Sequence, residues 1–252
     1  MTTGRPLVDG VLFDVDDTLV DTRGAFVAAL DVVVTAYLPH LPAERHGEVL
    51  ATWRADVGGH YRAYTRGEVP YEVQRMARAN ELHGAFGGPV LDDAGYERWN
   101  AVFEAGFSGA WAAHADASGT VDRLLAAGVR LGALTNAAVA YQTSKLERTG
   151  LADRVPMLVG VDTLGVGKPA PAVFLEACRR LGTEPGRTAY VGDELDVDAR
   201  AAVAAGLVGV WLDRPGPRRV HLAAQEIAAG RSAGVHVVTS LDEVPRRLGL
   251  AG

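Results

Sequence analysis

The sequence is poor in two chemically reactive residue types, cysteine and lysine. It has one cysteine, Cys178, and two lysines, Lys145 and Lys168, among its 25 lysine and arginine residues. A single cysteine excludes a disulfide within the chain. Cys178 falls with Phe174 and Leu181 in an apolar pattern of helical spacing, which predicts a core position and not a nucleophile.

Long apolar runs and an excess of positive charge are also lacking. The first apolar run, residues 11–13, is far too short for a signal or membrane segment, so we expect a cytoplasmic protein without membrane contact. The formal net charge of -6 argues against a nucleic-acid partner, because binding a phosphate backbone requires a basic face. With 48% hydrophobic residues in 252, the chain can bury a sizeable core, as one large domain or as a core with a smaller insertion.

Short apolar runs alternate with amphipathic stretches in the second half of the chain. The stretches 120–127, 141–149 and 171–181 each end at a glycine, as helices commonly do. The apolar runs have the length of buried parallel strands. They are residues 8–13, 129–134, 157–161, 188–191, 207–212 and 235–238. This alternation predicts a doubly wound parallel α/β sheet covered by helices on both faces, with ligands at the carboxyl ends of the strands.

Residues 22 to about 110 interrupt this alternation. They carry apolar residues at helical spacing and loop signals such as Gly87-Gly88-Pro89, but no convincing strand. We therefore expect an α/β core from residues 1–21 and 111–252, with an all-helical domain inserted at 22–110.

Acidic residues follow the first predicted strand directly. Asp14, Asp16 and Asp17 place three carboxylates within four residues. Such crowding is unfavourable unless a cation or another use offsets the repulsion. Taken alone, however, an acidic strand end is more often a turn or a helix cap.

Two later predicted strands also end in polar residues. Thr135-Asn136 follows one of them, and Asp193 and Asp198 follow another. Lys168, in a loop, is notable in a chain that otherwise uses arginine, because it supplies a compact ammonium. If these ends share one sheet edge, several carboxylates meet one lysine, and a hard divalent cation such as Mg²⁺ fits their oxygen ligands. Lys145, on the helix after Thr135, is interpreted as a surface residue.

The order of these elements resembles the motifs of the haloacid dehalogenase superfamily of aspartyl-phosphate-forming hydrolases, in its phosphatase branch with a helical cap. The matching residues, in motif order, are Asp14 and Asp16, Thr135, Lys168, and Asp193 with Asp198. The resemblance extends over nearly the whole chain, including residues 199–206 and 237–245.

The resemblance implies a mechanism. Asp14 would attack phosphorus, and Asp16 would protonate the leaving oxygen and later deprotonate water. Mg²⁺ would be held by the Asp14 carboxylate, the Asp16 backbone carbonyl and Asp193, with Asp198 as a further candidate. Thr135, Asn136 and Lys168 would bind the phosphoryl oxygens of a small-molecule phosphate ester.

Some residues of the motifs have less certain roles. Asp198 could hold a metal-bound water, orient Lys168 or cap a helix. Asp17, where many relatives have glycine, is expected to be structural, as is Thr18, whose hydroxyl can tie the turn. Glu194 stands where a serine is common, so its role stays open.

Other activities of this superfamily make different demands on the motif residues. The dehalogenase branch lacks an aspartate at the position of Asp16, and phosphonate cleavage requires a cap lysine, which the chain lacks before Lys145. A sugar-phosphate mutase would share every core motif and stays open. A catalytically silent binding protein would normally have lost one of the motif residues.

The helical insertion is the expected source of substrate selection, as a lid that excludes water. Its polar candidates are Arg23, Arg54, His60, Tyr61, Arg62, Tyr64 and Arg66. The sequence indicates neither the substrate nor the oligomeric state.

Overall fold

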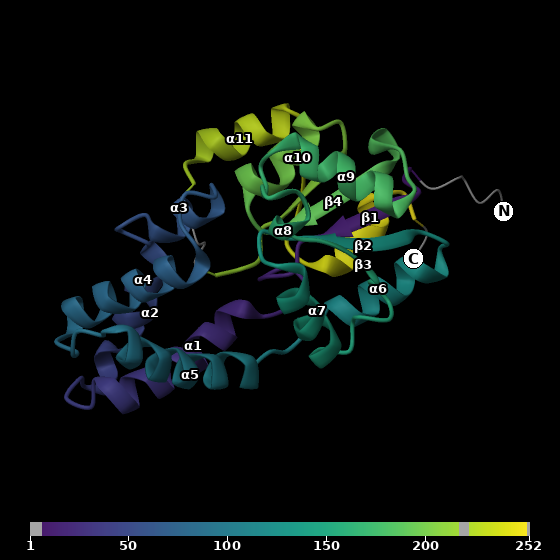
Figure 1. Cartoon of the computed structure of the whole chain (residues 1–252). Coiled ribbons are helices and arrows are strands. Elements are labelled where there is room, and N and C mark those ends of the chain that lie inside the picture. The colour runs from purple at the N-terminus through teal and green to yellow at the C-terminus, as the bar shows by residue number, and fades with distance from the viewer. Residues whose placement is uncertain (1–6, 217–221, 251–252) are drawn as a thin grey trace. The chain divides into compact units, whose positions relative to one another are not determined.

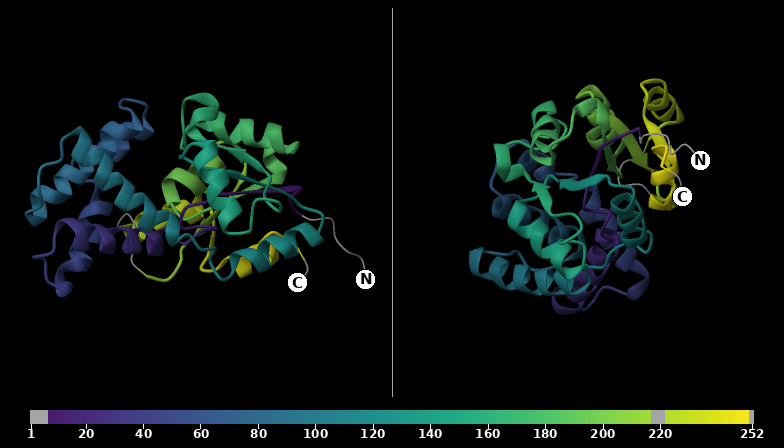
Figure 2. Two further views of the ribbon diagram at one scale, coloured as in Figure 1. Left: turned by 60° about the horizontal axis from the view of Figure 1, so that its bottom comes forward. Right: turned by 90° about the vertical axis from the view of Figure 1, so that its right-hand side faces the viewer.

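The computed structural model describes residues 7–216 and 222–250. The chain forms two compact units, one made of residues 1–21 and 113–252 and the other of residues 22–112. In the described residues, the strands all belong to the first unit and the second is helical (Figures 1 and 2).

The first unit is built on a six-stranded parallel sheet of order β3-β2-β1-β4-β5-β6. The strands are β1 (Gly10–Phe13), β2 (Arg130–Leu134), β3 (Met157–Val159), β4 (Thr188–Gly192), β5 (Val208–Leu212) and β6 (His236–Val238). From β1 the chain adds strands first on one side and then on the other, so β1 with its neighbours β2 and β4 forms the switch point where such sheets bind ligands. The predicted doubly wound α/β fold is confirmed.

Side chains that alternate along the strands belong to two separate cores, one on each face of the sheet. Val11 and Phe13 of β1 pack on one face with the apolar residues of α6 (Ala117–Ala126) and α7 (Val139–Arg148), whereas Leu12 packs on the other with Phe174 and Cys178 of α9 (Pro171–Leu181). The predicted core position of Cys178 is therefore confirmed. The helical elements of this unit are α6 (Ala117–Ala126), α7 (Val139–Arg148), α8 (Val161–Leu164), α9 (Pro171–Leu181), η2 (Pro185–Arg187), η3 (Leu195–Arg200), α10 (Ala201–Ala204), α11 (Ala224–Ser232), η4 (Leu241–Glu243) and α12 (Val244–Arg247).

The second unit is a helical bundle around an aromatic cluster. Its elements are α1 (Thr22–Tyr37), η1 (Ala43–Arg45), α2 (His46–Ala55), α3 (His60–Thr65), α4 (Tyr71–Phe86) and α5 (Asp93–Gly109). Trp99 and Phe103 of α5 stack with ring centroids 5.2 Å apart, and Trp53 of α2 lies 5.3 Å from Phe103. The Arg75 guanidinium covers Phe103 at 4.3 Å, which lets a basic side chain belong to an apolar interior.

Candidate active site

The predicted site residues leave the sheet along one edge. The Asp14 amide donates to the Val191 carbonyl at 2.8 Å, which continues the ladder between β1 and β4 by one residue. Phe13 is in register with Ala133 of β2 and with Val191 of β4. Asp14, Thr135 and Asp193 therefore follow three adjacent parallel strands at their carboxyl ends.

A tight turn follows Asp16 and brings Leu19 and Val20 back to Val15, whose carbonyl accepts from both of their amides. Asp17 has φ 58°, a left-handed conformation that glycine adopts without strain, which explains why glycine is suited to this position. The Thr18 hydroxyl is buried and has no hydrogen-bond partner in the described structure, so the expectation that it ties the turn is wrong. Instead the Thr18 carbonyl accepts from Arg214 at 2.9 Å.

Lys168 is the centre of a buried polar network. Its ammonium donates to Asp14 Oδ1 at 2.8 Å, to Asp198 Oδ1 at 2.7 Å and to the Tyr190 hydroxyl at 2.7 Å. Tyr190 in turn donates to the Leu134 carbonyl at 2.9 Å, which ties the network to the end of β2. All three protons of the ammonium are used, so its position is fixed.

The charge balance around Lys168 shifts several pKa values. Burial opposes the ammonium, but Asp14 and Asp198 outweigh it and raise the pKa of Lys168 well above its usual value. Burial, partly offset by Lys168, raises the pKa of Asp14 to about 7. Burial and the neighbouring carboxylates of Asp198 and Asp14 also raise the pKa of Asp193 well above its usual value.

Asp14, Asp193 and Asp198 form a group that fits a hard cation. Each offers a carboxylate oxygen, and these atoms lie within 4.8 Å of one another. Burial raises the pKa of Asp14 and of Asp193, and the neighbouring carboxylates raise both pKa values further. A divalent cation with oxygen ligands would relieve the repulsion.

Asp198 is placed by a single π-helical turn. The turn η3 follows β4, and such turns in otherwise regular helices are frequent at functional sites. Asp198 Oδ2 accepts from the Glu194 amide at 2.9 Å while Oδ1 faces Lys168. The carboxylate rests directly on Gly192, where a Cβ atom would collide with it. Of the roles left open for Asp198, the geometry favours orienting Lys168.

Asn136 contacts the backbone of Lys168. Its Oδ1 accepts from the Lys168 amide at 2.6 Å and its Nδ2 donates to the Lys168 carbonyl at 2.9 Å. A Cβ atom at Gly167 would collide with the Asn136 side chain, so glycine permits this approach. The Asn136 side chain, expected to bind phosphate, is thus engaged in holding the loop that carries Lys168.

Lys145 is buried, so its interpretation as a surface residue is wrong. Its ammonium forms an ion pair with Asp16 Oδ1, and its side chain is 1% exposed. Gln142, one turn earlier on α7, donates to Asp16 Oδ2 at 2.6 Å and to Thr135 Oγ1 at 3.1 Å. The rarity of lysine was the signal that could have found Lys145. Gln142 and Tyr190 were missed because a glutamine on a helix and a tyrosine in an apolar strand are common elsewhere.

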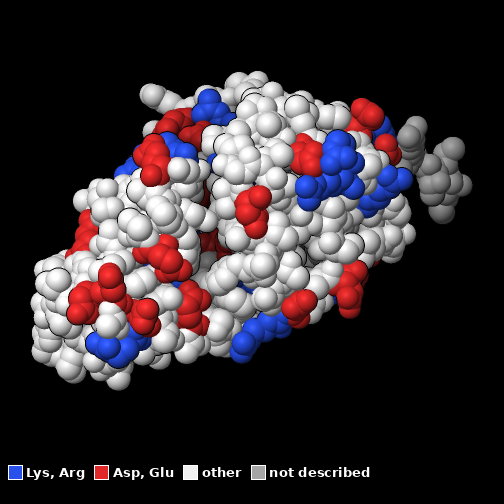
Figure 3. Space-filling model, viewed as in Figure 1, with Lys and Arg blue, Asp and Glu red and all other residues white. Residues whose placement is uncertain are grey.

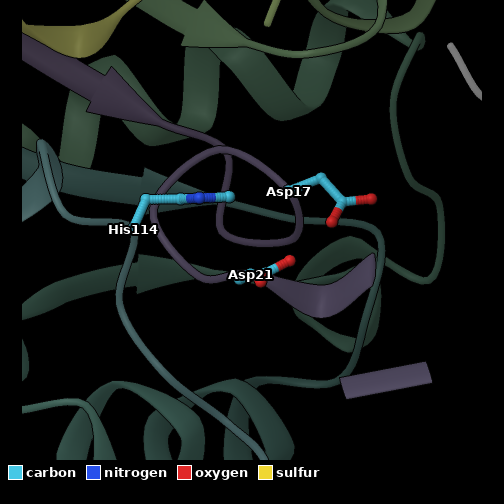
Figure 4. A group of neighbouring side chains, drawn as sticks. All are labelled: Asp17, Asp21 and His114. Atoms are coloured by element: carbon cyan, nitrogen blue, oxygen red, sulfur yellow. The ribbon is translucent and has the colours of Figure 1, made fainter. Parts of the chain in front are cut away.

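Asp17, Asp21 and His114 form a second group of possible metal ligands. The side chains of Asp17 and Asp21 come from the loop after β1, and His114 comes from the segment before α6 (Figure 4). Burial and the nearby Arg214 guanidinium lower the pKa of His114.

The polar residues expected to select substrate lie on α1, α2 and α3 of the second unit, except Arg66, which directly follows α3, and several have acidic partners there. His60 lies 3.8 Å from Glu81, and Arg62 lies 3.8 Å from Asp56. Arg66 forms an exposed pair with Glu68.

Charge is mixed over the surface in view. Acidic and basic side chains are interspersed on the face shown in Figure 3, and neither sign covers a continuous area of it. In the described residues, no helix combines the length and hydropathy needed to cross a membrane.

Comparison with known proteins decides the family. The model of the haloacid dehalogenase-like hydrolases matches residues 8–206. The chain belongs to this family. The resemblance predicted from the motifs is confirmed, and the protein is a hydrolase.

Individual relatives cover the chain to different extents. The chain is 29% identical to the ribulose-1,5-bisphosphate 5-phosphatase of Halopiger xanaduensis, over 94% of this chain and 98% of that protein. It is 42% identical to the glyceraldehyde 3-phosphate phosphatase of Methanopyrus kandleri, but over only 38% of this chain and 41% of that protein. Among solved structures, an L-2-haloacid dehalogenase is 26% identical with a TM-score of 0.73, over 96% of this chain and 99% of that one.

Proposed function

We propose that this haloacid dehalogenase-like hydrolase cleaves a small-molecule phosphate monoester through an aspartyl-phosphate on Asp14, with Mg²⁺ as cofactor. One observation carries the proposal: the Asp14 carboxylate lies 2.8 Å from a fully engaged Lys168 ammonium, within a cluster of carboxylates at the ends of adjacent strands. Asp16, two residues on, has separate donors of its own.

The residues divide the reaction between them. The free oxygen of Asp14 attacks phosphorus, and the bond to the leaving oxygen breaks while Asp16 gives that oxygen a proton. Asp16 then removes a proton from the water that attacks the aspartyl-phosphate, which releases inorganic phosphate and regenerates Asp14. Thr135 and Lys168 stabilise the charge on the phosphoryl oxygens in both steps.

The cation would be held by Asp14, Asp193 and the backbone of Asp16, with Asp198 beside them. When bound, it supplies positive charge to the transferring phosphoryl group and offsets the repulsion between the carboxylates.

Asp16 favours phosphate transfer over dehalogenation, although several solved neighbours are dehalogenases. Displacing a halide needs no acid for the leaving group, whereas displacing an alkoxide does. Here the Asp16 side chain is 36% exposed and held by two donors, as suits a group that exchanges protons with substrate.

The helical unit of residues 22–112 would act as the cap that selects the substrate and excludes water. The relatives carry names of enzymes that act on small phosphorylated carbon compounds, such as glyceraldehyde 3-phosphate and ribulose 1,5-bisphosphate. We therefore place the substrate in this class.

The experiment is a release assay on a panel of sugar phosphates, phosphoglycolate, polyol phosphates and nucleotides, with Mg²⁺ or with excess chelator. We expect Mg²⁺-dependent release of inorganic phosphate, and acid-quenched protein labelled on Asp14 by the phosphoryl group of the ester. Full activity in chelator, or label on another residue, would refute the proposed chemistry.

A further inference from the structure

One face of α7 holds both oxygens of Asp16. Gln142 and Lys145 lie three residues apart and so on the same side of the helix, and both are buried. Lys145 binds Asp16 Oδ1, and Gln142 Nε2 donates to Asp16 Oδ2 at 2.6 Å. The carboxylate therefore cannot rotate about its last bond without losing a partner. The helix itself is anchored by Leu146, which belongs to the core of the sheet.

Gln142 also determines the direction of the Thr135 hydroxyl. Thr135 Oγ1 accepts from Gln142 Nε2 at 3.1 Å and from the Ala137 amide at 3.3 Å. A hydroxyl oxygen has two acceptor sites, so both are filled and its own proton must be donated elsewhere. A phosphoryl oxygen requires such a donor.

The orientation of the Gln142 amide follows from its partner. A carboxylate only accepts, so the nitrogen of the amide must face Asp16. The opposite atom, Oε1, is buried and has no partner in the described part of the chain. An unsatisfied buried acceptor destabilises a fold, so this side chain is not explained by stability.

The Lys145 pair is likewise poorly explained as a packing contact. Its ammonium is buried, while the Asp16 side chain is 36% exposed. An apolar side chain of the same length would fill the space without the cost of desolvating a charge. Both lysines of the sequence contact a motif aspartate, Lys168 with Asp14 and Lys145 with Asp16.

We propose that Gln142 and Lys145 are positioning residues that hold the Asp16 carboxylate in the orientation for proton transfer, and that Gln142 also directs the Thr135 hydroxyl at the phosphoryl group. This inference rests on the proposed function. It concerns the orientation of Asp16 and not its proton affinity.

The test compares two esters in Lys145→Met, Gln142→Leu and a control, Arg148→Met, which removes a cation from the exposed face of the same helix. Phenyl phosphate has a leaving group that benefits from an acid, whereas dinitrophenyl phosphate has one that does not. For Lys145→Met we expect turnover of phenyl phosphate to fall on the order of 100-fold, because a positioned acid contributes that much. Labelling of Asp14 by dinitrophenyl phosphate should change little, and the labelled protein should accumulate because its hydrolysis needs the base. Gln142→Leu should in addition slow labelling by both esters, and Arg148→Met should match the wild type.

The decisive measurement is made in an Asp16→Asn background. A positioning residue has nothing left to position there, so adding Lys145→Met should cause no further loss. A purely structural role predicts the same loss in both backgrounds and equal loss for both esters, and either result would overturn the inference. Thermal unfolding identifies a variant that has not folded. If Lys145→Met does not fold, Lys145→Arg is compared with the wild type on the same two esters, and it should retain part of the acid-dependent rate. A wild type that never labels Asp14 refutes the proposed function, whereas a labelled wild type with unchanged variants refutes only the positioning role.

Discussion

The two lysines of this chain pair with two aspartates only two residues apart, yet the two regions differ in nearly every physical respect. Around Lys168 both partners are buried: the side chains of Lys168 and Asp14 are 4% and 9% exposed. Around Lys145 the ammonium is buried and the Asp16 carboxylate is open to solvent. The first region fixes charge in a dry environment, and the second holds a carboxylate that can meet water.

This difference corresponds to the two tasks of the proposed reaction. A nucleophile beside a transferring phosphoryl group needs fixed positive charge and exclusion of water. A residue that acts as both acid and base must instead reach the leaving group and the incoming water, so it needs one accessible side and a fixed orientation. Two nearby residues of one turn can serve both tasks because their carboxylates have different partners, Lys168 for Asp14 and α7 for Asp16.

The largest expected effect comes from exchanging the two aspartates for asparagine one at a time. Asp14→Asn should lose at least about 10⁴-fold in kcat, because no aspartyl-phosphate can form. Asp16→Asn keeps the nucleophile, so an activated ester should still label Asp14, and the label should then persist because no base activates water. Steady-state assays measure the loss in kcat, and rapid-quench mass spectrometry measures the label on Asp14. Substantial activity in Asp14→Asn with no label in Asp16→Asn would assign the nucleophile to the other carboxylate.

Metal removal should affect the Asp14 region far more than the Asp16 region. Chelation should abolish turnover of an aryl phosphate, and Mg²⁺ should restore it, because Asp14, Asp193 and Asp198 otherwise repel one another and the substrate. Mg²⁺ should also raise the unfolding temperature, since a ligand that binds only the folded state stabilises it. An Asp193→Asn variant is the control and should lose most of this thermal shift.

The two ammonium groups should differ in their contribution to stability. Lys168→Met leaves Asp14 and Asp198 buried without their cation, so we expect the free energy of unfolding to fall by about 3–5 kcal/mol. Lys145→Met should cost less, about 1–3 kcal/mol, because the exposed side of Asp16 stays hydrated. Denaturant unfolding without Mg²⁺ at pH 8 measures both. At lower pH the Lys168→Met deficit should shrink, since Asp14, whose pKa is already raised to about 7 by burial, becomes neutral. Equal costs for the two variants would contradict the comparison.

The sequence predicted the Asp14 region better than the Asp16 region, and the reason is physical. Strand ends and acidic clusters are local patterns, so the positions of β1, β2 and β4 and the residues that follow them could be read from short windows. The partners of Asp16 come from α7, more than 120 residues away, and nothing in an amphipathic helix tells which face meets another loop. For the same reason Tyr190 was recognised as a strand residue while its hydroxyl contact with Lys168 was not.

A third ion pair, Arg214 with Asp116, provides a purely structural reference for the two lysine pairs. Arg214 donates to both oxygens of Asp116 at 2.9 Å and to the Thr18 carbonyl, and Asp116 also accepts from Ser240 and from the Leu241 amide. Burial acts to raise the pKa of Asp116, but these hydrogen bonds outweigh it and lower the pKa to about 2.

Because the folded pKa of Asp116 lies below the usual value of 3.8, its contribution to stability is present above about pH 4 and is lost as the pH falls toward 2. A shift of this size would correspond to about 2 kcal/mol for a fully buried group, and because Asp116 is only partly buried, solvent screening reduces its contribution to about 1 kcal/mol. We therefore expect Asp116→Asn to lower the free energy of unfolding by up to that amount at pH 6 and by about a third of it at pH 2.5, where the folded carboxyl is still largely ionised, when denaturant unfolding is compared with the wild type at each pH. The preference between phenyl and dinitrophenyl phosphate should not change in Asp116→Asn, because this pair ties the turn after Asp16 and touches no reacting group. If Asp116→Asn instead lost turnover of phenyl phosphate but kept its labelling by dinitrophenyl phosphate, as expected for Lys145→Met, the turn alone would be enough to orient Asp16. The distinction between a positioning contact and a structural one would then fail.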